Sequence, residues 1–218
     1  MGGYAPAGWG SREDYPEVRS RQREKIMTKL HLPAYFETPR LILRRLEVED
    51  EPMVLSLLRD TKTDQVPLQR LFPNVFLVRD KLRKSYLQWQ EESEWHLLIL
   101  SKEVANEPLG IMSISLNFKP LPQHTSFPSE SSLYLSWMMM DTQRDMNYVI
   151  EAIRKLLQLV KNSKNIQRAY AILLSKDIVN QRIAQDVGMA INTLIDQPYL
   201  VPYNGHRVRA SIYEMQID

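Results

Sequence analysis

A strand-like segment that runs directly into a long amphipathic helix narrows the choice of folds for this chain more than anything else in its sequence. Residues 133–140 are almost entirely apolar or aromatic, and residues 148–161 repeat apolar side chains at helical spacing. Only a short polar segment separates the two. A strand that feeds a helix through a short turn directs backbone N–H groups at the helix N-terminus, which makes the turn a natural cradle for phosphate. This arrangement predicts a mixed α/β domain with an anion-binding turn near its centre.

The rest of the chain alternates strand-like and helical segments. Strands are predicted at residues 40–45, 95–100, 109–116, 133–140, 167–174 and 208–217, and helices at residues 52–58, 77–92, 148–161 and 177–188. Segments 61–73, 118–132 and 199–205 read as loops or turns. The order is β, α, α, β, β, β, α, β, α, β. We therefore expect a single α/β domain over residues 34–218, preceded by an N-terminal extension over residues 1–33 that is partly disordered or helical.

Helix boundaries are marked by specific residues. The first helix opens in an acidic turn with Pro52, and the last helix has Asp177 as its N-cap and Gly188 as its stop. In the helix at 77–92, Leu82, Tyr86 and Trp89 recur at helical spacing and predict the buried face.

Composition excludes several classes of function. With 218 residues, of which 44% are hydrophobic, the chain can bury a good core. Its net charge of +2 gives no basic field for nucleic acid. The absence of cysteine excludes disulfides, thiolate metal sites and a cysteine nucleophile, and the four histidines lie too far apart in sequence to predict a metal site.

The expected location of the protein is the cytoplasm, or the cytoplasm and the nucleus. No apolar run approaches the roughly 20 residues that a membrane-spanning helix needs. The first residues also lack the apolar segment of a secretory signal. Neither a membrane nor a nucleic acid is therefore an expected partner.

Several motifs, in this order, resemble the GNAT superfamily of acyl-CoA-dependent N-acetyltransferases, and within it the branch that acetylates ribosomal-protein N-termini and related amines. They are the opening FETPRLILR at residues 36–44, Leu109-Gly110 in the predicted hairpin, Glu151-Ala152 in the central helix and Val187-Gly188-Met189 after the next helix. The resemblance covers residues 36–217. It implies a mostly antiparallel sheet of six or seven strands flanked by helices, with a V-shaped opening between strands 133–140 and 167–174, and acetyl-CoA as cofactor.

The turn before the central helix departs from the family pattern. In the family it reads R/Q-x-x-G-x-G/A, and its amides hold the CoA pyrophosphate. Arg144 matches the family arginine just before the first glycine, but Asp145 and Asn147 stand at the two glycine positions. The next helix begins N-x-x-S in the family, and here Asp177 and Asn180 take those places. The resemblance implies that acetyl-CoA, if bound, contacts Met139, Met140, Arg144, Asp145, Met146, Asn147, Tyr148, Val149 and Asn180.

Asp145 is the substitution with the largest expected effect. A carboxylate about 5 Å from a pyrophosphate costs on the order of 3 kcal/mol per charge pair at an effective dielectric constant near 20. Side chains at both glycine positions also restrict the approach of the backbone to a ligand. Asp145 can equally be a carboxylate that complements the helix dipole, and that role is incompatible with tight pyrophosphate binding at the same amides.

Few residues are candidates for catalysing the transfer of the acetyl group. Acetylation of an amine needs a base near the nitrogen and an acid for the leaving thiolate. Family members often use a glutamate on the strand before the turn and a tyrosine on the following helix. Here the strand offers only Tyr134 and Ser136 as catalytic candidates, and the tyrosine position falls near Ala184. Tyr134 also fits a packing role, and Trp137 to Met140 suit either a pantetheine groove or a core.

Two hypotheses on function follow. In the first, the chain is a GNAT-fold acetyltransferase homologue with a degraded acetyl-CoA site, which makes it a catalytically impaired binding or regulatory module. In the second, it is an active acetyl-CoA-dependent N-acetyltransferase that acts on a protein N-terminus or a small primary amine. The expected partner is accordingly a protein or an amine, and the sequence specifies no oligomeric state.

Overall fold

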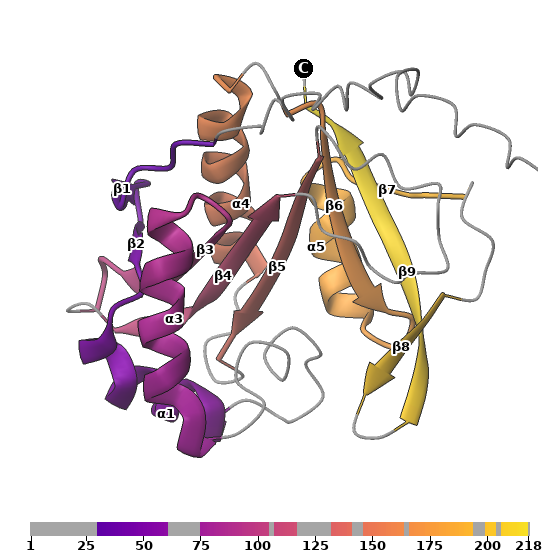
Figure 1. Cartoon of the computed structure of the whole chain (residues 1–218). Coiled ribbons are helices and arrows are strands. Elements are labelled where there is room, and N and C mark those ends of the chain that lie inside the picture. The colour runs from indigo at the N-terminus through magenta and orange to yellow at the C-terminus, as the bar shows by residue number, and fades with distance from the viewer. Residues whose placement is uncertain are drawn as a thin grey trace, which may run out of the picture.

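A nine-stranded sheet forms the centre of the computed structural model (Figure 1). The structure describes residues 30–60, 75–104, 107–116, 132–140, 146–163, 166–193, 199–203 and 206–217. The strands are β1 (Tyr35–Glu37), β2 (Leu41–Arg45), β3 (Glu94–Ser101), β4 (Pro108–Leu116), β5 (Ser132–Met139), β6 (Arg168–Leu174), β7 (Ala190–Ile191), β8 (Tyr199–Tyr203) and β9 (His206–Gln216). Their order is β1-β2-β3-β4-β5-β6-β9-β7, and β8 also pairs with β9. Among these described strands, every pairing is antiparallel except that of β5 with β6.

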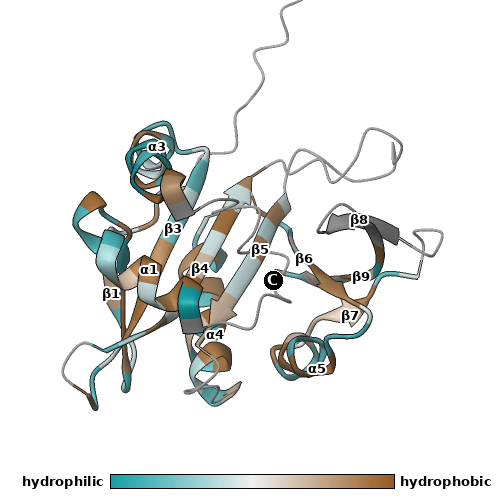
Figure 2. Ribbon diagram, turned by 90° about the horizontal axis from the view of Figure 1, so that it is seen from below, coloured by the Kyte–Doolittle hydropathy of each residue, from teal (hydrophilic) through white to brown (hydrophobic). Residues whose placement is uncertain are grey.

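Helices cover both faces of this sheet. The 3-10 turns η1 (Val48–Asp50) and η2 (Val75–Leu77) lead into α1 (Glu51–Asp60) and α3 (Val78–Gln90), which pack together on one face. Helices α4 (Met146–Lys161) and α5 (Ile178–Asp186) pack on the other face. Figure 2 shows α3 on one side of the sheet and α4 and α5 on the opposite side.

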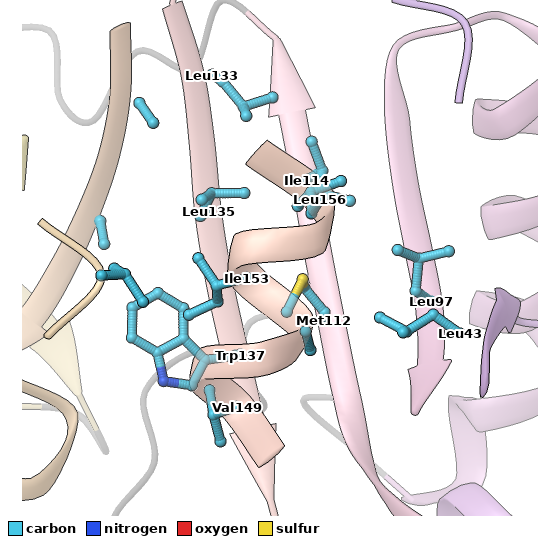
Figure 3. Packing of buried hydrophobic residues seen from close by; sticks show 14 of the residues in the cluster. Leu43, Leu97, Met112, Ile114, Leu133, Leu135, Trp137, Val149, Ile153 and Leu156 are labelled. Carbon is cyan, nitrogen blue, oxygen red and sulfur yellow. The ribbon is translucent and has the colours of Figure 1, made fainter. Parts of the chain in front are cut away.

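The alternation of side chains along the strands divides the core into two layers. Leu97, Met112 and Leu135 face α4 and pack with Ile153 and Leu156 of that helix (Figure 3). The intervening residues face the other way, where Leu98, Ile111 and Met138 join Val54, Leu57 and Leu82 of α1 and α3. A fully buried leucine or isoleucine contributes roughly 1.5–3 kcal/mol, so these two layers supply most of the driving force that fixes the position of β5.

The parallel pair β5 and β6 separates along its length. Their ladder consists of three pairs and ends at Tyr134 and Tyr170, although β5 continues to Met139 and β6 to Leu174. Figure 1 shows the two strands meeting at one end and diverging toward the other. We call the diverging space between them the V. It lies where the family resemblance implies an opening.

The predicted fold class is confirmed, and most predicted elements are present within a few residues. Helix α4 begins at Met146, two residues before the predicted start. Asp177 accepts a hydrogen bond from the backbone N–H of Asn180, which confirms it as an N-cap, and Gly188 has the positive φ of a helix stop. Of the expected extension, residues 1–29 lie outside the described residues, while Leu30 and Leu32 are buried in the core.

Three further predictions differ from the structure or cannot be compared with it. Within the described residues the sheet has nine strands rather than six or seven, because the short β1, β7 and β8 add to it. Residues 199–205 were expected to form a turn, but Tyr199–Tyr203 is strand β8; Pro202 is tolerated there because the strand pairs with β9 alone among the described residues. The loops predicted at 61–73 and 118–132 lie outside the described residues, apart from Ser132, which begins β5.

The buried face of α3 is also rotated from the prediction. Ser85, not Tyr86, lies in the buried stripe with Leu82 and Trp89. Tyr86 is 44% exposed, and the guanidinium of Arg45 lies 4.8 Å from the centre of its ring. Spacings of three and four residues both return to one helix face, so the sequence pattern fitted either residue.

Candidate functional site

The two catalytic candidates lie on one face of β5, Tyr134 at the last pair of the ladder with β6 and Ser136 just beyond it. Tyr134 and Ser136 are half-buried, and they point to the same side of the sheet as Met138, which packs with α1 and α3. Tyr134 pairs across the sheet with Ser115 and with Tyr170. Ser136 lies opposite Ser113 of β4. Tyr134 and Ser136 thus belong to a set of polar side chains, with Ser113 and Ser115, on neighbouring strands of the sheet.

His96 of β3 extends this polar set, and sequence reasoning missed it. Its Nδ1 lies 2.8 Å from the hydroxyl of Ser113, and the residue is only 1% exposed. Burial, together with the positive charge of Lys81, lowers the pKa of His96 to about 4, so the ring is neutral at physiological pH. Its Nε2 has no hydrogen-bond partner among the described residues, although the Glu94 carboxylate lies 3.6 Å away. Burial raises the pKa of Glu94, against the opposing effects of its hydrogen bond with Gln88 and of the positive charges of Lys84 and Lys81.

Trp137 occupies the other face of β5, beyond the last pair of the parallel ladder. Its indole N–H donates a 2.8 Å hydrogen bond to Oδ1 of Asn180, in the first turn of α5. The indole lies beside Val149 and Ile153 of α4 (Figure 3), and Trp137 is 3% exposed. The side chain therefore reaches from one arm of the V to the helix that follows the other arm.

Asn180 is fixed by two hydrogen bonds to the carboxylate of Asp177. Its Nδ2 donates to the carboxylate of Asp177 at 2.6 Å, while its backbone N–H donates to the same carboxylate at 3.1 Å. Because the amide nitrogen is committed to Asp177, the amide oxygen is the atom turned toward the indole. The two residues that replace the family's asparagine and serine thus bind each other and Trp137.

The first turns of α4 form a second cluster. The guanidinium of Arg40, in the turn between β1 and β2, donates to Glu151 at 2.8 Å and lies 4.5 Å from the ring centre of Tyr148. The hydroxyl of Tyr148 donates to Glu103, in the turn between β3 and β4, at 2.7 Å. Burial raises the pKa of Glu151, but hydrogen bonds from Thr38 and Arg40 outweigh it, so the pKa lies below its usual value. The start of α4 is therefore tied to two turns of the sheet.

The structure brings some of the predicted cofactor-binding residues together and separates one from the rest. Met139 and Val149 are buried in the layer that contains Trp137, whereas Met140 lies in the layer formed by α1 and α3. In the first turn of α4, Met146 and Tyr148 are half-buried and Asn147 is exposed. Arg144 and Asp145 lie outside the described residues.

Two features are absent from the part of the chain that the structure describes. No three His, Cys, Asp or Glu side chains there gather as metal ligands would. No helix there is long and apolar enough to cross a bilayer.

A mostly antiparallel sheet with one parallel pair that opens into a V, followed by a helix at its mouth, defines the class of folds used by acyl-CoA-dependent acetyltransferases. The family comparison agrees with this class. The model of the acetyltransferase (GNAT) domain matches residues 40–190, and the chain belongs to this family.

Solved structures repeat the likeness at the level of the fold. An acetyltransferase from Salmonella typhimurium, described as modifying the N-terminal serine of ribosomal protein L7/L12, matches with a TM-score of 0.66 at 15% identity, over 83% of this chain and 97% of that one. RimL, a ribosomal L7/L12 α-N-protein acetyltransferase in complex with coenzyme A, matches with a TM-score of 0.66 at 14% identity, over 85% and 97%. The microcin C7 self-immunity acetyltransferase MccE, in complex with acetyl-CoA and AMP, gives 0.67 at 16% identity, over 85% and 98%. Curated protein sequences give no significant match.

Proposed function

We propose that this chain is a GNAT-fold binding or regulatory module whose acetyl-CoA site is degraded. The observation that carries the proposal is the pair Asp145 and Asn147 at the glycine positions of the phosphate turn. A carboxylate there repels the pyrophosphate, and the loss of roughly two charge-assisted hydrogen bonds, at about 1.5–3 kcal/mol each, weakens CoA binding by orders of magnitude.

Contacts of the described residues support the same conclusion. Trp137 is almost completely buried on the α4 side of β5 and is bonded to Asn180 beyond the end of the β5–β6 ladder, so this part of the V fits a pantetheine arm poorly as it stands. This packing is expected of a site that no longer holds CoA.

The module's partner, on this proposal, is a protein. RimL and the Salmonella enzyme are described as acting on a ribosomal protein, which suggests a polypeptide N-terminal segment as the ligand of this chain. Neither nucleic acid nor membrane is proposed as a partner, and the proposed location is the cytoplasm, or the cytoplasm and the nucleus.

Isothermal titration with acetyl-CoA tests the proposal. The natural chain is expected to show no binding at concentrations on the order of micromolar, and the variant D145G/N147G is expected to gain affinity. Asp145→Asn is the single-residue test and Asp80→Asn is its matched control. Each removes one negative charge, but Asp80 lies on α3, across the sheet from α4. Only the change at Asp145 should improve binding. Micromolar binding by the natural chain would defeat the proposal.

One observation favours a second candidate, an active N-acetyltransferase. The β5–β6 ladder stops at Tyr134 and Tyr170, so the strand separation that accompanies acyl-CoA binding in this fold is kept. Such an enzyme would grip its cofactor through Arg144 and the remaining amides, and it would acetylate a protein N-terminus or a small primary amine. Release of free thiol from acetyl-CoA with a panel of peptides and amines tests it. Turnover above background on any acceptor would establish this candidate in place of the first.

A further inference from the structure

We propose that Trp137 and Asn180 form a latch that closes the V, as a second barrier to acyl-CoA that is separate from the altered phosphate turn. This inference rests on the proposed function, since it describes why the same site is closed. The latch consists of the hydrogen bond from the indole N–H of Trp137 to the amide oxygen of Asn180 and of the indole ring, which fills the space between β5 and α5.

The position of the bond in the fold is the first argument. Trp137 follows the last ladder residue of β5, Tyr134, by three positions, on the arm that diverges from β6. Asn180 belongs to the first turn of α5, the element that follows β6. The 2.8 Å bond therefore links β5 to the helix that follows β6, beyond the point where the ladder between the two strands ends. Where the backbone ladder between β5 and β6 has ended, this side-chain hydrogen bond still connects β5 with α5.

Packing around the indole is the second argument. Trp137 is 3% exposed, and it shares its layer with Val149, Ile183 and Ala184, each of which is almost completely buried. Protein interiors are packed at the density of organic crystals, so a pantetheine arm cannot enter beside this ring unless the ring moves. Movement would break the bond and leave an indole N–H without its partner, at a cost typical of an unsatisfied buried donor.

The anchoring of Asn180 is the third argument. Asp177 fixes the amide nitrogen, and the next residue, Gln181, donates to the carbonyl oxygens of Leu174 and Ser175 at 2.8 and 2.9 Å. The start of α5 is thus bound to the end of β6. An acceptor held on a fixed turn keeps the indole in one orientation, whereas a mobile side chain would not.

If Trp137 were only a structural core residue, it would be buried in the same way, but loss of its hydrogen bond would not change the affinity for acetyl-CoA. Trp137→Phe keeps an aromatic ring and removes the N–H and part of the volume. Asn180→Ser shortens the acceptor and restores the residue type of the family at this position. Trp95→Phe is the matched control, because Trp95 is equally buried in the same layer but lies on β3, away from the V. Circular dichroism and thermal melting would check that each variant is folded before its affinity is compared.

The experiment measures acetyl-CoA affinity by isothermal titration in the D145G/N147G background, where the proposed obstacle in the turn is absent. Adding W137F or N180S should tighten binding by about ten-fold, the range that one hydrogen bond contributes, while adding W95F should leave it unchanged. If D145G/N147G binds and neither addition changes its affinity, the latch is refuted and the proposed function stands. Binding in none of the backgrounds also refutes the latch. Tight binding by the natural chain refutes the proposed function itself.

A second measurement does not depend on ligand. NMR spectroscopy can follow the exchange of the Trp137 indole proton with deuterium, and the signal of this proton is assigned by its loss in W137F. In the natural chain this proton should exchange slowly. Asn180→Ala should speed that exchange by at least about ten-fold and leave the signal of Trp95 unaffected. Equal exchange in both proteins would show that the bond does not hold the ring and would overturn the inference.

Discussion

Arg40 and Glu151 are joined twice: the carboxylate accepts hydrogen bonds from the backbone N–H of Arg40 at 3.1 Å and from its Nε at 2.8 Å. Two of the motifs that carry the family resemblance, at residues 36–44 and at Glu151-Ala152, are therefore the two sides of a single contact. The contact fixes the helix that follows the phosphate turn against the edge of the sheet. Its role is structural, and it persists whether or not the site binds CoA.

Replacing Glu151 with glutamine should cost roughly 1 kcal/mol of unfolding free energy, because the charge-assisted component of the pair is lost while one polar contact remains. Urea unfolding measures the effect, and a double-mutant cycle with Arg40→Lys isolates the coupling. A coupling energy within error of zero would show that the two residues do not stabilise α4 as a pair.

Stability should fall as the pH decreases from about 6.5 to about 4, because of His96. In the unfolded chain this group takes up a proton near pH 6.5, but in the folded chain its pKa is about 4. The unfolded state therefore binds more protons across this interval, which lowers the unfolding free energy by roughly 3 kcal/mol at the acid end. Urea unfolding at a series of pH values measures the slope.

The matching variants for that experiment are His96→Gln and His31→Gln. The first should flatten the pH dependence between about 4 and 6.5, whereas the second should leave it in place, since the side chain of His31 is largely exposed. An unchanged slope in H96Q would assign the pH dependence to other groups and contradict the account of His96.

Gly110→Ala should destabilise the fold severely, by at least about 2 kcal/mol. A Cβ at this position would lie 2.0 Å from the carbonyl oxygen of Met138 and 2.7 Å from the sulfur of Met139, so β4 and β5 could not keep their present separation. The shift in urea midpoint gives the value. A loss below roughly 0.5 kcal/mol, typical of a surface change, would mean that the strands separate easily here.

Gly188→Ala should cost less, about 1 kcal/mol, and for a different reason. The backbone has a φ of +96°, which alanine adopts only under strain, but the nearest atom to an added Cβ is 4.0 Å away. Thermal or urea unfolding of both alanine variants side by side checks the order. If G188A were the more damaging of the two, the distinction between conformational strain and steric overlap would be wrong.

The sequence predicted the elements whose signals are local. Asp177 and Gly188 mark the ends of α5 because capping chemistry involves residues within one turn of each other. The hairpin of β3 and β4 follows from two apolar runs separated by a short turn. Strand β8 was missed because Pro202 and the following Asn204-Gly205 carry turn chemistry, and only its edge position makes a strand acceptable there.

The side-chain contacts of the site depend on distances in sequence that no local pattern encodes. Trp137 and Asn180 are 43 positions apart, and Arg40 and Glu151 are 111 positions apart. The apolar stretch that contains Trp137 fitted both a groove and a core, since hydrophobicity alone does not say what fills the other side. His96 carried no motif, and its place became clear only when β3 and β4 paired it with Ser113.

Determining the structure of the natural chain in crystals grown with coenzyme A is the most direct test of a degraded site. The account predicts that Trp137 stays bonded to Asn180 and that no diphosphate is bound at residues 144–149, where the turn leads into the start of α4. A diphosphate seated against the amides of those residues, with the pantetheine arm between β5 and β6, would contradict it.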